Sequence, residues 1–146
     1  MVYVPSAVTS RDPLWFVPAR LDEPSALIVY QLGQERTISA GSAEYSTVVM
    51  ALGEAVRGSE GAARAGLSDE TLHTLTQGTG AALEVRFDRP QRLGGAHTRG
   101  RPTRMLVALA GPFAQDPFVF LGDDSGWWAE ALVSSRVADV RHAVTP

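Results

Sequence analysis

The amino-acid sequence predicts an α+β fold in which an antiparallel β-sheet packs against two to three helices. Four short apolar runs separated by turn signals are typical of a β-meander, and they are Leu83–Phe87, Met105–Ala110, Phe118–Leu121 and Trp127–Val133. An N-terminal hairpin is expected to add further strands. Because the strands are grouped and do not alternate singly with helices, the order favours α+β over a doubly wound parallel fold.

The length of 146 residues is sufficient for one hydrophobic core. Residues 1–13 are rich in Pro, Ser and Thr, so we expect a flexible lead-in there, followed by a single domain over residues 14–146. Near its start, Leu14–Val17 is apolar and lies between Pro13 and Pro18, which is typical of a short edge strand or a plug.

The segments after this lead-in predict a hairpin and two helices. Strands are expected over Ala26–Leu32 and Glu35–Ser39, joined through Gly33-Gln34 as a type II′ turn. Ser42 is a candidate N-cap for a first helix that ends at Gly58. The apolar stripe of this helix has the i, i+3, i+4, i+7 spacing of a buried face, and its members are Tyr45, Val48, Val49, Leu52 and Val56.

The segment Gly58–Gly66 has the composition of a loop, and a second helix is expected to open at Ser68 and to end near Gly78 or Gly80. We expect the first two helices to cover one face of the sheet. The last two strands are joined by Asp123–Gly126, a turn sequence. A final helix is predicted to be capped by Ser134-Ser135 and to turn inward Val137, Val140 and Val144.

Composition excludes several classes of protein. A net charge of −3 disfavours general nucleic-acid binding, and no apolar run has the roughly 20 residues of a membrane helix. The first residues lack the features of a signal peptide, so the protein is expected to be cytosolic or to start after a removed leader. The absence of Cys and Lys excludes disulfides, thiolate metal sites and Schiff-base chemistry. With no Lys and no Asn, the composition indicates a GC-rich bacterial genome.

The loop over residues 90–104 is the candidate site for chemistry. It combines glycines with five basic side chains, namely Arg92, His97, Arg99, Arg101 and Arg104. Arginine forks bind carboxylate and phosphate groups, and glycines let backbone N–H groups approach an anion. We expect Arg99, Arg101 and Arg104 to contact an anion or an acidic protein partner, with His97 adding a contact when protonated. The alternative is a solvated loop whose arginines reflect genome composition.

Other residues give weaker signals. His73 and His142 are expected on helix surfaces, so no metal site is predicted, and no cofactor motif is present. Adjacent strand residues face opposite sides, so one of Trp127 and Trp128 is expected to be buried and the other partly exposed. Catalysis would require a carboxylate near His97, as in a hydrolase, and this is the least favoured interpretation.

Three stretches carry a resemblance to known proteins. They are Leu-Gly-Gln-Glu-Arg-Thr-Ile-Ser-Ala-Gly-Ser-Ala-Glu-Tyr-Ser-Thr-Val from Leu32, Ala-Leu-Glu-Val-Arg-Phe from Ala82, and Phe-Val-Phe-Leu-Gly-Asp-Asp-Ser-Gly-Trp-Trp from Phe118. Over residues 26–133 the pattern resembles extracytoplasmic regions of uncharacterised bacterial membrane-anchored proteins and lipoproteins, and more distantly the YycH/YycI-type regulators that restrain a cell-wall sensor kinase. The resemblance implies a non-enzymatic regulatory or protein-interaction domain outside the membrane. A cytosolic protein that binds a small ligand or an anion is the alternative.

Overall fold

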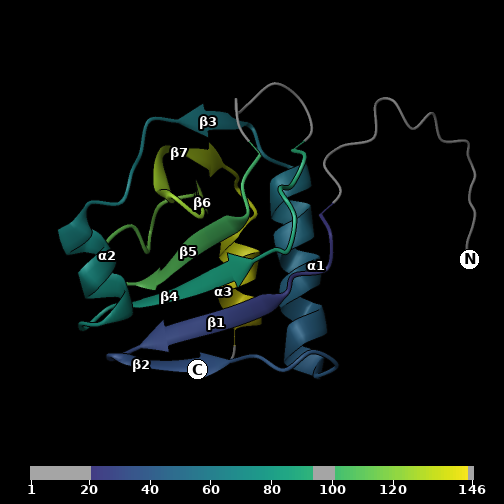
Figure 1. The fold of residues 1–146 in the computed structure, drawn as a ribbon, viewed down its shortest axis with the longest axis horizontal. Helices are drawn as coiled ribbons and strands as arrows, with labels where there is room; N and C mark the ends of the chain where they lie inside the picture. Colours follow the sequence, from purple (N-terminus) through teal and green to yellow (C-terminus); the bar gives the residue numbers. More distant parts are fainter. Residues whose placement is uncertain (1–20, 94–100, 145–146) are drawn as a thin grey trace, which may run out of the picture.

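The fold is α+β, with one seven-stranded antiparallel sheet and three helices, as the sequence predicts. A computed structural model describes residues 21–93 and 101–144. Its elements follow the chain in the order β1 (Ala26–Gln31), β2 (Gln34–Thr37), α1 (Ala43–Arg57), β3 (Gly61–Ala63), α2 (Asp69–Thr76), β4 (Ala81–Arg86), β5 (Arg104–Ala110), β6 (Phe118–Asp123), β7 (Gly126–Val133) and α3 (Val137–Ala143) (Figure 1).

The N-terminal hairpin and the C-terminal meander belong to the same sheet. Strand order is β2-β1-β4-β5-β6-β7-β3, so the pairing of β1 with β4 joins the two parts. Six antiparallel positions connect these strands, from Ala26 opposite Arg86 to Gln31 opposite Ala81. The sheet therefore has the hairpin strand β2 at one edge and the short strand β3 at the other.

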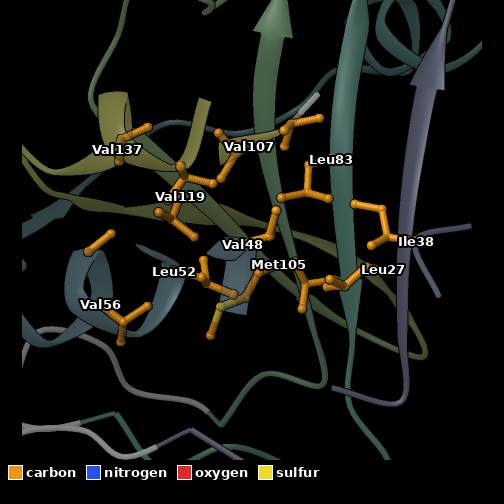
Figure 2. Close-up of a cluster of buried hydrophobic side chains, with 14 of the residues drawn as sticks. Leu27, Ile38, Val48, Leu52, Val56, Leu83, Met105, Val107, Val119 and Val137 are labelled. Atoms are coloured by element: carbon orange, nitrogen blue, oxygen red, sulfur yellow. The ribbon is translucent and has the colours of Figure 1, made fainter. Parts of the chain in front are cut away.

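Helices cover both faces of the sheet. The face against α1 and α3 buries the larger core, in which Leu52 of α1 lies among side chains of several strands (Figure 2). Its other members include Leu27, Val48, Val56, Leu83, Met105, Val107, Val119 and Val137. Both Leu52 and Met105 are at most 1% exposed, so this side of the sheet is closed to water.

The second helix, α2, packs on the opposite face, so the expectation that the first two helices share a face is wrong. Leu75 of α2 contacts a separate cluster that contains Ala82, Ala108 and Phe120. Small residues at positions 82 and 108 leave room for a helix to approach this face closely. Helix α2 lies at one end of the sheet, and strand residues beyond it remain uncovered by a helix (Figure 1).

Two helix starts are confirmed and one is not. The hydroxyl of Ser42 accepts a hydrogen bond from the backbone N–H of Tyr45 at 3.1 Å, and Ser68 caps α2 in the same way. In α3, the N-cap is Arg136 and has no side-chain cap bond. Ser134 instead accepts the N–H of Arg136 at 3.2 Å, so the predicted cap stabilises the turn before the helix.

Two local predictions are corrected by the structure. The hairpin turns at Leu32 and Gly33, with φ of 52° and 78°, in place of the predicted Gly33-Gln34 loop of type II′. Because Gln34 pairs with Gln31, the second strand starts one residue earlier and both central residues take positive φ, as in a type I′ turn. The predicted loop over residues 58–66 contains β3, whose Ala62 pairs with Leu132 of β7.

Several sequence predictions fall outside the described residues. They concern the lead-in over residues 1–13, the segment Leu14–Val17 and the loop positions 94–100. Over residues 21–93 and 101–144, no helix is long and apolar enough to cross a membrane.

Candidate functional site

A row of side chains crosses four strands on the face that carries α2. Antiparallel register places Arg86 of β4 opposite Arg104 of β5, Arg104 opposite Gly122 of β6, and Gly122 opposite Trp127 of β7. Directly paired residues share a face of the sheet. The register therefore brings two guanidinium groups side by side, next to an aromatic ring.

A buried carboxylate holds the two arginines together. Glu84 lies two residues before Arg86 on the same face and is only 4% exposed. Its Oε2 accepts a hydrogen bond from Arg86 Nε at 2.9 Å and lies 3.8 Å from Arg104 Nη1. Its Oε1 accepts the hydroxyl of Tyr30 at 2.8 Å. A buried carboxylate requires partners of this kind, because burial of an unpaired charge is costly.

Arg104 is fixed on two further sides. Its Nε and Nη2 donate to the backbone carbonyl oxygen of Asp123 at 3.1 and 2.8 Å. The guanidinium carbon lies 4.7 Å from the centre of the Trp127 ring, a cation–π distance. Gly122 separates Arg104 from Trp127 in the register and has no side chain to block this contact. The guanidinium of Arg104 is thus oriented in advance of any ligand.

Beside this row lies a pocket of about 290 Å³ at the end of the sheet. Both arginines line it, and the other lining residues are Ser25, Phe87, Thr103 and Asp124. The side chain of Arg86 is 48% exposed and that of Arg104 is 24% exposed, so both remain accessible to a solute. The wall also contains the buried hydroxyl of Thr103, which has no hydrogen-bond partner among the described residues.

Positive charge exceeds negative charge among Glu84, Arg86 and Arg104. Two guanidinium groups face one buried carboxylate, so the Glu84, Arg86 and Arg104 cluster carries one positive charge in excess. The hydrogen bond with Glu84 raises the pKa of Arg86, which keeps this guanidinium charged. Burial raises the pKa of the Tyr30 hydroxyl to about 12, and its hydrogen bond to Glu84 acts in the same direction.

The shifted pKa of Tyr30 makes the free energy of unfolding depend on pH in the alkaline range. A phenol whose pKa is about 12 in the folded state, against 10.0 ordinarily, stays protonated while the unfolded chain ionises. The unfolded state then binds fewer protons, so this contribution is complete below pH 10.0 and is lost as the pH rises towards 12. We expect the free energy of unfolding to fall less steeply over this range in Tyr30→Phe than in the wild type, as measured by urea denaturation. Equal slopes would contradict the pKa assigned to Tyr30.

The structure places only part of the predicted arginine site in this pocket. Arg104 is the first residue of β5 and lines the pocket, whereas Arg101 is exposed and does not. Arg92 is also exposed. His97 and Arg99 lie outside the described residues, so their predicted anion contacts stay predictions.

Sequence reasoning missed Arg86, Glu84 and Tyr30. In the sequence, Leu83, Val85 and Phe87 alternate with the charged residues Glu84 and Arg86, a pattern typical of a strand with one solvent-exposed face, which would carry Glu84. The neighbouring strands and Tyr30 bury it instead. The available signal was the Glu84–Arg86 spacing, because opposite charges two residues apart lie on the same face of a strand.

The other residues singled out in the sequence lie outside the pocket. His73 and His142 are exposed on helices, as predicted. Both Trp127 and Trp128 are partly buried, so the prediction that one is buried is wrong, although they do pack on opposite faces of the sheet. The carboxylate of Asp123 accepts the backbone N–H and the hydroxyl of Ser125 in the β6–β7 turn, and these bonds lower the pKa of Asp123.

No group of three acidic, His or Cys side chains suited to a metal ion occurs in the part of the chain that the structure describes. Comparisons of the chain with protein-family models, with curated proteins and with solved structures found no match.

Proposed function

We propose that this protein is a non-enzymatic binding domain that recognises an anionic group at the pocket formed by Arg86 and Arg104. The observation that carries the proposal is their direct pairing across β4 and β5 beside an accessible pocket. Two like charges at paired positions destabilise a sheet unless something negative joins them. Glu84 offsets one of the two charges, and a bound carboxylate or phosphate group would offset the other.

The geometry favours anion binding because the donors are positioned before the ligand arrives. Two hydrogen bonds to Asp123 and the Trp127 ring hold Arg104, while Glu84 holds Arg86. Ordering an arginine on binding normally costs side-chain entropy, and prior orientation reduces that cost. Nη1 of Arg104 makes no hydrogen bond within residues 21–93 and 101–144 and lies 3.8 Å from Glu84 Oε2, while Arg86 donates to Glu84 through Nε. Both guanidinium groups line the pocket.

Binding without turnover is proposed because the Glu84 carboxylate is already occupied by hydrogen bonds. Both oxygens of Glu84 accept hydrogen bonds, from Tyr30 and from Arg86, and the residue is only 4% exposed. Glu84 is therefore placed to orient the arginines, and not to take a proton from a solute. A regulatory role outside the membrane, implied by the resemblance of the sequence, stays a prediction.

The test is a titration of the protein with inorganic phosphate and with acetate at constant ionic strength, followed by NMR. The Nε–H signals of Arg86 and Arg104 and the indole N–H signal of Trp127 should shift together and saturate. Arg86→Gln should weaken binding by about tenfold, since a hydrogen bond to a charged group contributes roughly 1.5–3 kcal/mol. Added sodium chloride should weaken it as well.

A matched control is Arg136→Gln, at the residue that precedes α3. The side chain of Arg136 is 55% exposed and pairs with Glu54, away from the pocket, so the same loss of charge occurs at a comparable exposure. We expect this variant to bind anions like the wild type. Equal weakening in Arg86→Gln and Arg136→Gln would indicate a general charge effect and contradict the pocket, as would the absence of any saturable shift.

A further inference from the structure

The pocket also contains a negative charge that neither arginine neutralises. Asp124 lies in the turn between β6 and β7 and lines the pocket together with Arg86 and Arg104. Within the described ranges, its carboxylate forms no ion pair and no hydrogen bond, although two guanidinium groups line the same hollow. Opposite charges therefore stand apart across one small pocket.

The neighbouring acidic residue differs from Asp124. The Asp123 carboxylate is occupied by Ser125, and the Asp123 carbonyl oxygen is occupied by Arg104. Local turn structure thus accounts for Asp123, while Asp124 is exposed at the tip of the turn and is among the residues that line the pocket. A serine hydroxyl is present as well, since Ser25 donates to the carbonyl oxygen of Arg86 at 3.1 Å and its oxygen can still accept.

We infer that the site selects a zwitterionic amino-carboxylate, a small molecule of the amino-acid class, whose carboxylate lies on the arginine pair and whose ammonium group faces Asp124. This inference rests on the proposed anion-binding function and adds the ligand class. An ammonium group is donor-only and carboxylate oxygens are acceptors, so the Asp124 carboxylate complements it. The Ser25 hydroxyl lies on the other side of the arginine pair, beside β1. A phosphate group or a simple carboxylate carries no cationic group and would leave Asp124 without a partner.

The volume of the pocket is consistent with this class. About 290 Å³ is just below the usual range for small-molecule sites, which is roughly 300–1,000 Å³. A free amino acid fits such a space, whereas a nucleotide would not be enclosed. Phe87 also lines the pocket, and its side chain is 6% exposed because it belongs to the core beneath α1 and α3.

The experiment compares amino-carboxylates with matched acids that lack the amine. The probes are glycine, β-alanine and γ-aminobutyrate against acetate, propionate and butyrate, measured by NMR titration of wild type and Asp124→Asn. At least one amino-carboxylate should bind roughly two- to fivefold more tightly than its matched acid, the gain that a solvent-accessible ion pair supplies. Asp124→Asn should remove this preference and bind the simple acids at least as tightly, because it removes a negative charge from the pocket.

The outcomes separate the two proposals. If no probe shifts the signals of Arg86 and Arg104, the anion-binding function itself is wrong. If the simple acids bind but no amino-carboxylate exceeds its matched acid, the anion site stands and the zwitterion is excluded. A preference that persists in Asp124→Asn would also overturn the assignment, since the ammonium group would then have another partner. Spectra of Asp124→Asn that retain the wild-type dispersion show that the variant is folded.

Discussion

Replacing Leu52 by alanine is expected to lower the free energy of unfolding by about 2–5 kcal/mol, the usual cost of deleting a fully buried leucine. Leu52 is 1% exposed and belongs to the core between α1 and the sheet. Figure 2 shows Leu52 among core side chains such as Val48 and Met105. The substitution removes contacts with this cluster and leaves a cavity in the core. Urea denaturation of the two proteins measures the difference.

The same helix supplies the control. Met50 lies two positions away in α1 and is 68% exposed, so Met50→Ala keeps the helix propensity and removes little buried surface. We expect it to change the free energy of unfolding by less than about 0.5 kcal/mol. Similar losses in the two variants would mean that α1 does not pack on the sheet through the Leu52 stripe.

Helix α1 could be predicted from the sequence because its information is local. Its apolar spacing, its Ser42 cap and its final Gly58 all lie within one short segment. The strand β3 could not be found in this way, because Gly61, Ala62 and Ala63 have low β propensity. They become a strand only by pairing with the edge of β7, which is a tertiary interaction. The side of the sheet on which α2 packs also depends on tertiary contacts, because Leu75 of α2 packs against small residues of β4 and β5.

In the candidate site too, local features could be predicted from the sequence and contacts between distant strands could not. Arg104 was predicted as an anion contact because it closes an arginine-rich loop, a feature visible in sequence. Its partner Arg86 belongs to another strand, and only the register of β4 with β5 brings the two together. Asp124 was interpreted as a turn residue, which is correct for its backbone, but its place in the pocket depends on where the β6–β7 turn ends relative to β5.

Replacing Gly122 by alanine tests how the sheet positions Arg104. A β-carbon at this position would lie 2.8 Å from the carbonyl oxygen of Gly126 and 2.8 Å from Cε3 of Trp127. Both distances are too short for a carbon atom, and the first partner is backbone, so the turn and the indole ring must shift. We expect Gly122→Ala to lower the free energy of unfolding by about 1–3 kcal/mol, the typical cost of overpacking.

A second glycine provides the matched control for this substitution. Gly53 lies in the interior of α1, and a β-carbon there would meet nothing within 4 Å. Gly53→Ala should therefore raise the free energy of unfolding by about 0.5–1 kcal/mol, because alanine favours the helix more than glycine does. Opposite signs for the same chemical change would show that the loss at position 122 is steric. A neutral or stabilising Gly122→Ala would contradict the close approach of β6 and β7.

The consequence of Gly122→Ala for the site follows from the cation–π contact. The Arg104 guanidinium lies 4.7 Å from the Trp127 ring centre across Gly122, so displacing the ring removes one of the groups that orient this arginine. Anion binding should weaken in Gly122→Ala even where the variant is fully folded, whereas Gly53→Ala should bind like the wild type. NMR titration with acetate, read at the Nε–H of Arg104 and at the indole N–H of Trp127, measures both. Unchanged affinity in folded Gly122→Ala would mean that the bonds to the Asp123 carbonyl oxygen orient Arg104 without help from Trp127.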